Sequence, residues 1–133
     1  MTKIVITYLV TLVTFVAIDL VWLGWLARAT YMAELGDLLR KQTILVAAVI
    51  FYAVYAAGLM FFAVWPGLKS GSIVQTIGLA AALGFVAYGT YDLTNLSVVN
   101  GFSVKIAVID LLWGTCVSAM ASAATFLIVS KLT

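Results

Sequence analysis

The chain of 133 residues contains no histidine, one cysteine and one proline. Without histidine, and with Cys116 as the single thiol, a zinc or copper site has almost no ligands to draw on. Cys116 cannot form an internal disulfide, so it does not indicate a redox compartment. The sequence therefore argues against zinc and haem chemistry. It also lacks a serine–base motif or a reactive cysteine in a polar setting that would support a nucleophilic mechanism.

Charged residues are also scarce, at 9% of the chain, and the formal net charge is only +2. The positive charges are spread along the sequence, with no basic patch that would indicate nucleic-acid binding and no acidic tail. We therefore expect no nucleic-acid partner.

Hydrophobic residues make up 65% of the chain, whereas a soluble globular domain has an apolar share of roughly 45–50%. This composition predicts an integral membrane protein. No Pro/Gly/Ser-rich linker, low-complexity tract or shift of composition divides the chain. We expect residues 1–133 to form a single transmembrane domain.

Four long apolar stretches are candidates for multi-pass transmembrane helices, because a helix of about 20 apolar residues crosses a bilayer. They cover about residues 4–27, 43–64, 73–96 and 102–129. The run Trp65-Pro66-Gly67 is expected to end the second span, because proline and glycine break helices. Short connections between the spans predict an all-α four-helix bundle with up-down-up-down topology and both termini on one side.

The only extended polar stretch lies between the first and second spans, at residues 28–42. Tyr31, Leu35, Leu38 and Leu39 recur there at helical spacing, while charged residues face elsewhere. This pattern predicts a short helix lying in the membrane interface.

Three aspartates, Asp19, Asp92 and Asp110, lie inside the apolar runs in similar short phrases. A charged side chain near the middle of a membrane costs from ~3 to more than ~10 kcal/mol, so it needs a partner, a proton or a water-filled cavity. In the antiparallel bundle all three fall near the same end, and we expect them to share one layer. The alternative interpretation is that they cap, tilt or join helices in a protonated or hydrogen-bonded form.

Other polar and aromatic side chains are expected near this layer. Tyr88, Asp92 and Asn95 share one helix face at positions i, i+4 and i+7. Tyr52 and Tyr55 are either core aromatics whose hydroxyls bond a carbonyl or donors to the carboxylates. Trp22 and Trp113 each follow an aspartate by three residues. The two tryptophans could wall a cavity, or they could serve as interface anchors and core aromatics.

Several carboxylates close together in a low dielectric cannot all ionise without compensation. A proton could supply it, and so could a cationic substrate, or Arg28 and Lys105 reaching inward. A hard cation such as Mg²⁺, Ca²⁺ or Na⁺ is the third source, since it prefers oxygen ligands. The residues that could offer such oxygens are Asp19, Asp92, Asp110, Asn95 and Thr94. The sequence does not choose among these sources and identifies no cofactor.

Three functions are compatible with these features. The first is cation- or proton-coupled binding or transport of a small ligand by the aspartate cluster. The second is a membrane enzyme acting on lipid, with the aspartates as general acid and base or as metal ligands. The third is a structural or assembly subunit whose acids join helices. The small-residue stripes Thr76, Ala80, Gly84 and Gly114, Ser118, Ser122 would then pack against another membrane protein. Their simpler interpretation is close packing between neighbouring helices.

Three longer phrases around the aspartates resemble the DUF2177 family of small, uncharacterised bacterial membrane proteins. They are Ile18-Asp19-Leu20-Val21-Trp22-Leu23-Gly24, Tyr88-Gly89-Thr90-Tyr91-Asp92-Leu93-Thr94-Asn95 and Ile109-Asp110-Leu111-Leu112-Trp113-Gly114. The resemblance implies a protein of the bacterial inner (cytoplasmic) membrane and supplies no established activity. The expected partners are the lipid bilayer and a cation or small cationic ligand, and assembly into homo-oligomers stays open.

Overall fold

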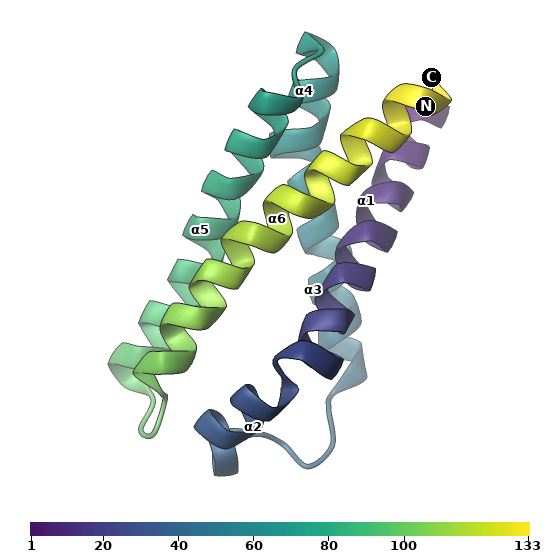
Figure 1. Cartoon of the computed structure of the whole chain (residues 1–133). Helices are drawn as coiled ribbons and strands as arrows, with labels where there is room; N and C mark the ends of the chain where they lie inside the picture. The colour runs from purple at the N-terminus through teal and green to yellow at the C-terminus, as the bar shows by residue number, and fades with distance from the viewer.

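Four long helical segments run antiparallel in the computed structural model, which describes residues 1–133 (Figure 1). The segments are Thr2–Leu26, Leu45–Ser70, Ile73–Val98 and Val104–Leu132, and each is long and apolar enough to cross a membrane. Both termini lie at one end of the bundle, together with the turn between the second and third segments. The predicted all-α, up-down-up-down four-helix bundle is therefore confirmed.

The first two segments each contain a π-helical stretch, whereas the last two are continuous. The elements are α1 (Thr2–Val21), the π-helix η1 (Trp22–Leu26), α2 (Arg28–Leu35), the 3₁₀ turn η2 (Gly36–Leu38), α3 (Leu45–Leu59), the π-helix η3 (Met60–Val64), α4 (Trp65–Ser70), α5 (Ile73–Val98) and α6 (Val104–Leu132). Wider π turns change the direction in which the following side chains point.

The second helical segment continues past Trp65-Pro66-Gly67, so the expected end near residue 64 is wrong. Pro66 lies in the first turn of α4, where a missing backbone N–H is tolerated. The helix instead ends at Gly71, whose φ of 72° is the left-handed conformation typical of a glycine cap. Ser72 then begins α5 by accepting the backbone N–H of Gln75 at 3.1 Å.

The polar stretch after the first span forms a shorter helix than residues 28–42. Helix α2 ends at Leu35 because Gly36 adopts φ 47° and ψ −117°, and only the short turn η2 follows. Figure 1 places α2 at the end of the bundle opposite the termini. The short helix therefore covers the end of the bundle near which all three intramembrane aspartates lie.

The helices pack in a ring in which α6 lies between α1 and α5. Helix α1 also contacts α3, while α5 contacts η3 and α4 rather than the length of α3. Helices α3 and α5 thus approach each other at the α4 end and diverge toward the α2 end, as Figure 1 shows. This divergence leaves space between them where the acids lie.

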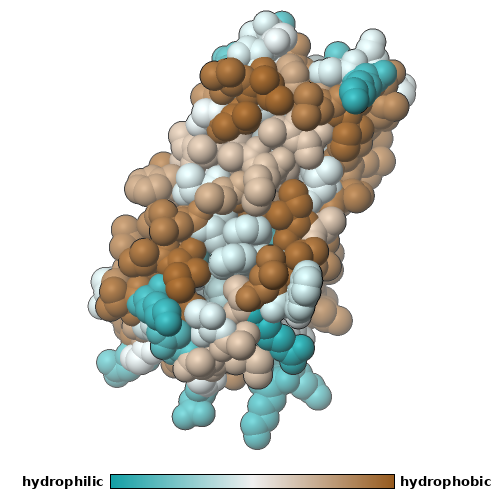
Figure 2. All heavy atoms as spheres, in the orientation of Figure 1, coloured by the Kyte–Doolittle hydropathy of each residue, from teal (hydrophilic) through white to brown (hydrophobic).

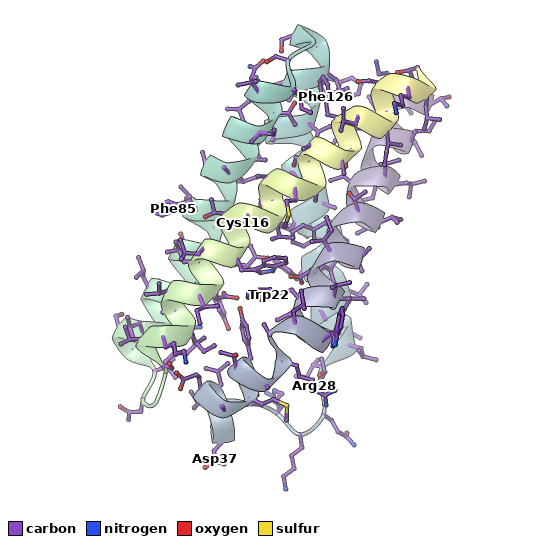
Figure 3. The ribbon with its side chains drawn as sticks, viewed as in Figure 1. Trp22, Arg28, Asp37, Phe85, Cys116 and Phe126 are labelled. Carbon is purple, nitrogen blue, oxygen red and sulfur yellow. The ribbon has the colours of Figure 1, made fainter.

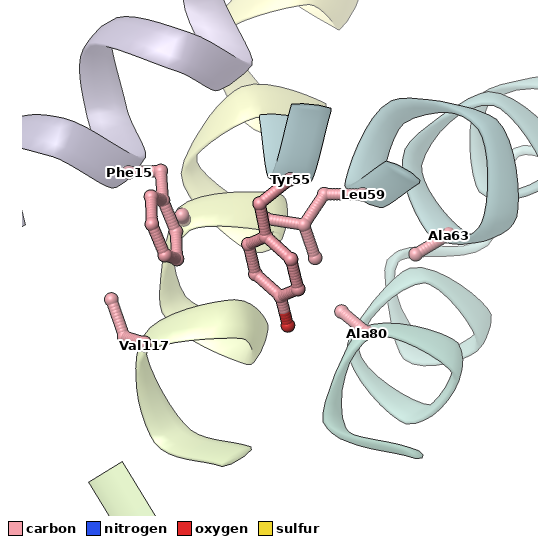
Figure 4. Packing of buried hydrophobic residues seen from close by; sticks show 7 residues of the cluster. Phe15, Tyr55, Leu59, Ala63, Ala80 and Val117 are labelled. Atoms are coloured by element: carbon pink, nitrogen blue, oxygen red, sulfur yellow. The ribbon is translucent and has the colours of Figure 1, made fainter. Parts of the chain in front are cut away.

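The core of the bundle lies at mid-height and combines apolar and small polar side chains. Its main cluster consists of Phe15, Tyr55, Leu59, Ala63, Ala80, Val117 and Ala121. Tyr55 lies at the centre of this cluster in Figure 4, and its hydroxyl lies 2.7 Å from Ser118 Oγ. Buried residues include both predicted small-residue stripes. Small residues therefore let α5 and α6 approach closely.

The outer surface of the bundle is largely apolar. Figure 2 shows hydrophobic atoms over much of one face and strongly hydrophilic atoms gathered toward the ends. Large side chains such as Val74, Phe61 and Val54 are more than half exposed. A soluble protein would bury such side chains, so this surface fits a lipid environment.

Candidate functional site

All three intramembrane aspartates line one cavity of about 590 Å³. The lining residues come from every part of the bundle: Asp19, Leu23, Tyr31, Leu35, Leu39, Ala48, Phe51, Tyr52, Tyr55, Ala87, Tyr88, Tyr91, Asp92, Phe102, Ile106 and Asp110. Helix α2 and the turn after it contribute Tyr31, Leu35 and Leu39, so they cover the cavity at its outer end. The antiparallel topology is what brings acids from α1, α5 and α6 to the same depth.

Asp19 is held by two hydrogen-bond donors. The Tyr52 hydroxyl donates to Asp19 Oδ2 at 2.6 Å, and Trp113 Nε1 donates to Asp19 Oδ1 at 2.9 Å. The side chain is only 3% exposed. Each carboxylate oxygen therefore has a partner from a different helix, which fixes the orientation of the group.

Asp110 accepts a hydrogen bond from the short helix that covers the cavity. The Tyr31 hydroxyl donates to Asp110 Oδ1 at 2.7 Å and accepts from Trp22 Nε1 at 3.2 Å. Burial is the main cause that raises the pKa of the Tyr31 hydroxyl above its ordinary value. Tyr31 therefore keeps its proton and remains a donor.

Two stacked tryptophans connect these two hydrogen-bonded groups. The rings of Trp22 and Trp113 lie 4.4 Å apart between centroids and are nearly parallel, at 7°. Figure 3 places Trp22 between the ribbons of α1 and α6. The stack thus joins the Asp19 side of the site to the Tyr31–Asp110 side.

Asp92 differs from the other two acids because no donor reaches it. The residue is completely buried, and both of its carboxyl oxygens lack a hydrogen-bond partner. Its polar neighbour is the carboxyl group of Asp110, which could donate a hydrogen bond only if it carried a proton. A buried carboxylate without a donor or a cation is strongly unfavourable. The site is therefore incomplete around Asp92.

The rest of the wall is aromatic and apolar, and it carries no positive charge. Of the 16 lining residues, 13 are hydrophobic, and they include five tyrosines at positions 31, 52, 55, 88 and 91. Neither Arg28 nor Lys105 lines the cavity. These two basic side chains were candidates for compensating the acids from inside the protein, and neither of them reaches the cavity.

The structure places the predicted site residues in three groups. Tyr52 and Tyr88 line the cavity beside the aspartates. Trp22 and Trp113 lie behind the wall and act through hydrogen bonds and stacking. Asn95, like Thr94, is not part of the lining.

Two tyrosines of the wall, Tyr31 and Tyr91, were not considered as site residues from the sequence. Tyr55 was considered as a donor to the carboxylates, but its hydroxyl pairs with Ser118 Oγ. Tyr31 lies on the apolar face of the polar stretch, and that face was assigned to the membrane interface. Its hydrogen bond to Asp110 follows the bend at Ala27, between η1 and α2. Tyr91 directly precedes Asp92 and carried a usable signal, because the Tyr-Asp pair is in the distinctive phrase of that helix.

No group of three or more Asp, Glu, Cys or His side chains in the structure is arranged to hold a metal ion. The hard-cation site predicted from Asp19, Asp92 and Asp110 therefore stays a prediction. Asp19 has its own two donors, whereas Asp92 and Asp110 form a separate pair. The arrangement offers an anionic, aromatic-walled space that can hold a proton or a cation.

Comparison with known proteins agrees with the membrane architecture. The family described as "Predicted membrane protein (DUF2177)" matches residues 4–127. No curated protein and no solved structure matches the chain. Because the match covers nearly the whole chain, the protein belongs to the DUF2177 family of predicted membrane proteins.

Proposed function

We propose that this protein binds a small organic cation in the aspartate cavity and exchanges it for a proton, as the binding step of proton-coupled transport. The observation that supports the proposal is Asp92, a fully buried carboxyl group on the cavity wall with no donor on either oxygen. A buried carboxyl group in this position is stabilised only by a proton or by a cation that enters from outside the protein.

The proton resides on the carboxyl pair Asp92 and Asp110 when the cavity is empty. Two adjacent carboxylates in a low dielectric cannot both stay ionised, and one shared proton removes the repulsion. A bound monovalent cation takes over the compensation that the shared proton supplied, so the proton leaves as the cation enters. One positive charge replaces another, and the net charge of the site is unchanged.

The tyrosine rings favour an organic cation over a hydrated metal ion. Aromatic faces attract ammonium groups through cation–π interactions, and these strengthen when the cation loses water. Tyr52, Tyr55 and Tyr88 line the cavity next to Asp19 and Asp92. Asp19, already oriented by its two donors, adds further carboxyl oxygens to the cavity wall.

The direct test measures proton release when the protein in lipid nanodiscs is titrated with tetramethylammonium in a weakly buffered solution. We expect about one proton per bound cation, because one shared proton is displaced. Asp92→Asn should abolish the release and weaken binding about thirtyfold or more, since loss of one partner of a buried charge pair costs ~2–5 kcal/mol.

The matched control is Asp37→Asn, which removes an exposed acid in the 3₁₀ turn η2. This variant should bind the cation and release protons like the wild type. Equal affinity and equal proton release in Asp92→Asn and wild type would disprove the proposal, as would the absence of any cation-dependent proton release.

A further inference from the structure

A second hollow, a groove between α3 and α5, lies beside the aspartate cavity and is almost entirely apolar. It has a volume of about 460 Å³ and is lined by Ala47, Ile50, Phe51, Val54, Tyr55, Gly58, Phe62, Leu83 and Ala87. Phe51, Tyr55 and Ala87 line both the groove and the cavity. The two spaces are therefore neighbours that share one wall.

The groove opens on the lipid-facing side of the bundle. Ile50, Val54 and Phe62 line it and are each more than half exposed, and α3 and α5 diverge there (Figure 1). From Ala47 to Phe62 the helix advances roughly 22 Å at ~1.5 Å per residue. This length exceeds the thickness of one leaflet, which is about half of the ~30 Å hydrocarbon core.

Together the two spaces match an amphiphile in the leaflet on the α2 side of the membrane. The cavity is acidic like a site for a polar head group, and the groove is apolar like a site for a hydrocarbon tail. The acids lie toward the α2 end, and the groove runs from there toward the α4 end. A head group near that membrane surface would meet the carboxylates, while its tail would follow the groove toward the bilayer centre. No lysine or arginine lines either space, so the charge of the site selects a positive head group.

We infer that the ligand is an amphiphilic cation, with a single amine or quaternary ammonium group in the aspartate cavity and an alkyl tail in the α3–α5 groove. This inference rests on the proposed function and specifies the substrate class. A phospholipid does not meet the requirement, because its phosphate would enter an acidic cavity that has no positive side chain in its wall. A small hydrophilic cation would use the cavity and leave the groove to lipid.

The test blocks the groove without touching the acids. A Cβ added at Gly58 meets no atom within 4 Å, so Gly58→Leu extends into the groove from a position with free space. Proton release in nanodiscs is titrated with dodecyltrimethylammonium and, separately, with tetramethylammonium, with empty nanodiscs as the blank. In Gly58→Leu the half-saturating concentration of the long-chain cation should rise about tenfold or more because of steric exclusion. The value for tetramethylammonium should stay within about twofold, because the head-group site is unchanged.

Two further variants separate the groove from general effects on the helices. Gly78→Leu makes the same substitution at an exposed position of α5, where an added Cβ also meets no atom, and it should leave both titrations unchanged. Val54→Phe fills the same groove one helical turn before Gly58 and should reproduce the selective loss. It serves as the test if Gly58→Leu does not fold.

Three results would overturn the inference. If both cations release protons and the groove variants affect them equally, the tail does not occupy the groove. If dodecylphosphocholine, which adds a phosphate to the same head and tail, releases protons as effectively, the ligand is not selected as a simple cation. If neither cation releases protons from the wild type, the proposed function itself fails.

Discussion

Asp19 and Asp92 show how differently one membrane protein can treat two buried acids. Asp19 receives the Tyr52 hydroxyl and the Trp113 indole, whereas Asp92 receives no donor. The first arrangement satisfies a carboxylate within the protein and fixes its direction. The second leaves a buried carboxyl group that receives no hydrogen bond from the rest of the chain.

The role of Tyr52 can be tested by Tyr52→Phe. The substitution keeps the ring but leaves Asp19 Oδ2 without a donor in a side chain that is only 3% exposed. We expect a destabilisation of about 1–3 kcal/mol, the usual cost of an unsatisfied buried polar group. Thermal unfolding in detergent, followed by tryptophan fluorescence, measures the change.

Tyr88→Phe is the control for this measurement, because the Tyr88 hydroxyl on the same cavity forms no hydrogen bond within the protein. Its unfolding temperature should remain close to that of the wild type. If both substitutions lower the unfolding temperature equally, the hydrogen bond from Tyr52 to Asp19 is not the cause of the destabilisation.

At the scale of the helices, the contact between α5 and α6 depends on glycines and small residues. A Cβ added at Gly84 would overlap the carbonyl oxygen of Gly114 and come 2.6 Å from Ser118 Oγ. A Cβ at Gly114 would overlap the ring of Tyr88, which lines the cavity. The same close approach therefore holds the two helices together and positions an aromatic wall of the site.

Gly84→Ala should force α5 and α6 apart, because the added methyl meets backbone that cannot rotate away. Overpacking of this kind costs about 1–3 kcal/mol, and we expect a lower unfolding temperature of the purified protein in detergent. Gly78→Ala is the matched control in the same helix, since its Cβ meets nothing within 4 Å. If the two alanine variants unfold at the same temperature, the close contact does not contribute to stability.

At the scale of the whole molecule, a buried acid without a donor reduces the stability of the fold that contains it. Asp92 is buried without a donor beside the carboxyl of Asp110, in a protein with only 25 buried residues of 133 to stabilise it. Functional sites often lower the free energy of unfolding, compared with the same fold carrying residues chosen only for stability.

We therefore expect Asp92→Asn to stabilise the unliganded protein. The new amide can donate a hydrogen bond to the carboxyl group of Asp110, and such a hydrogen bond contributes about 0.5–1.5 kcal/mol. The unfolding temperature should rise above that of the wild type, while Asp37→Asn should leave it unchanged. A lower unfolding temperature for Asp92→Asn would show that the carboxyl group stabilises the fold, as the structural-subunit hypothesis requires.

Much of the architecture follows from local properties of the sequence. Long apolar runs can satisfy their backbone hydrogen bonds in lipid only as helices or closed barrels, so the four helices were predictable. The alternation of direction then placed Asp19, Asp92 and Asp110 at one end. The end of the second helix was not predictable in this way, because Pro66 is tolerated at the first turn of α4 and the chain turns only at Gly71.

The composition, the four apolar runs and the positions of the aspartates along them determined a membrane bundle with acids at one depth. Only the tertiary structure decided which acid has partners, because hydrogen bonds depend on rotations of the helices that sequence periodicity does not set. The π-helix η1 and the bend at Ala27 precede α2, and Tyr31 in the first turn of α2 reaches Asp110. The divergence of α3 from α5 leaves Asp92 on an open cavity beside a groove, because small residues draw α5 toward α6 instead.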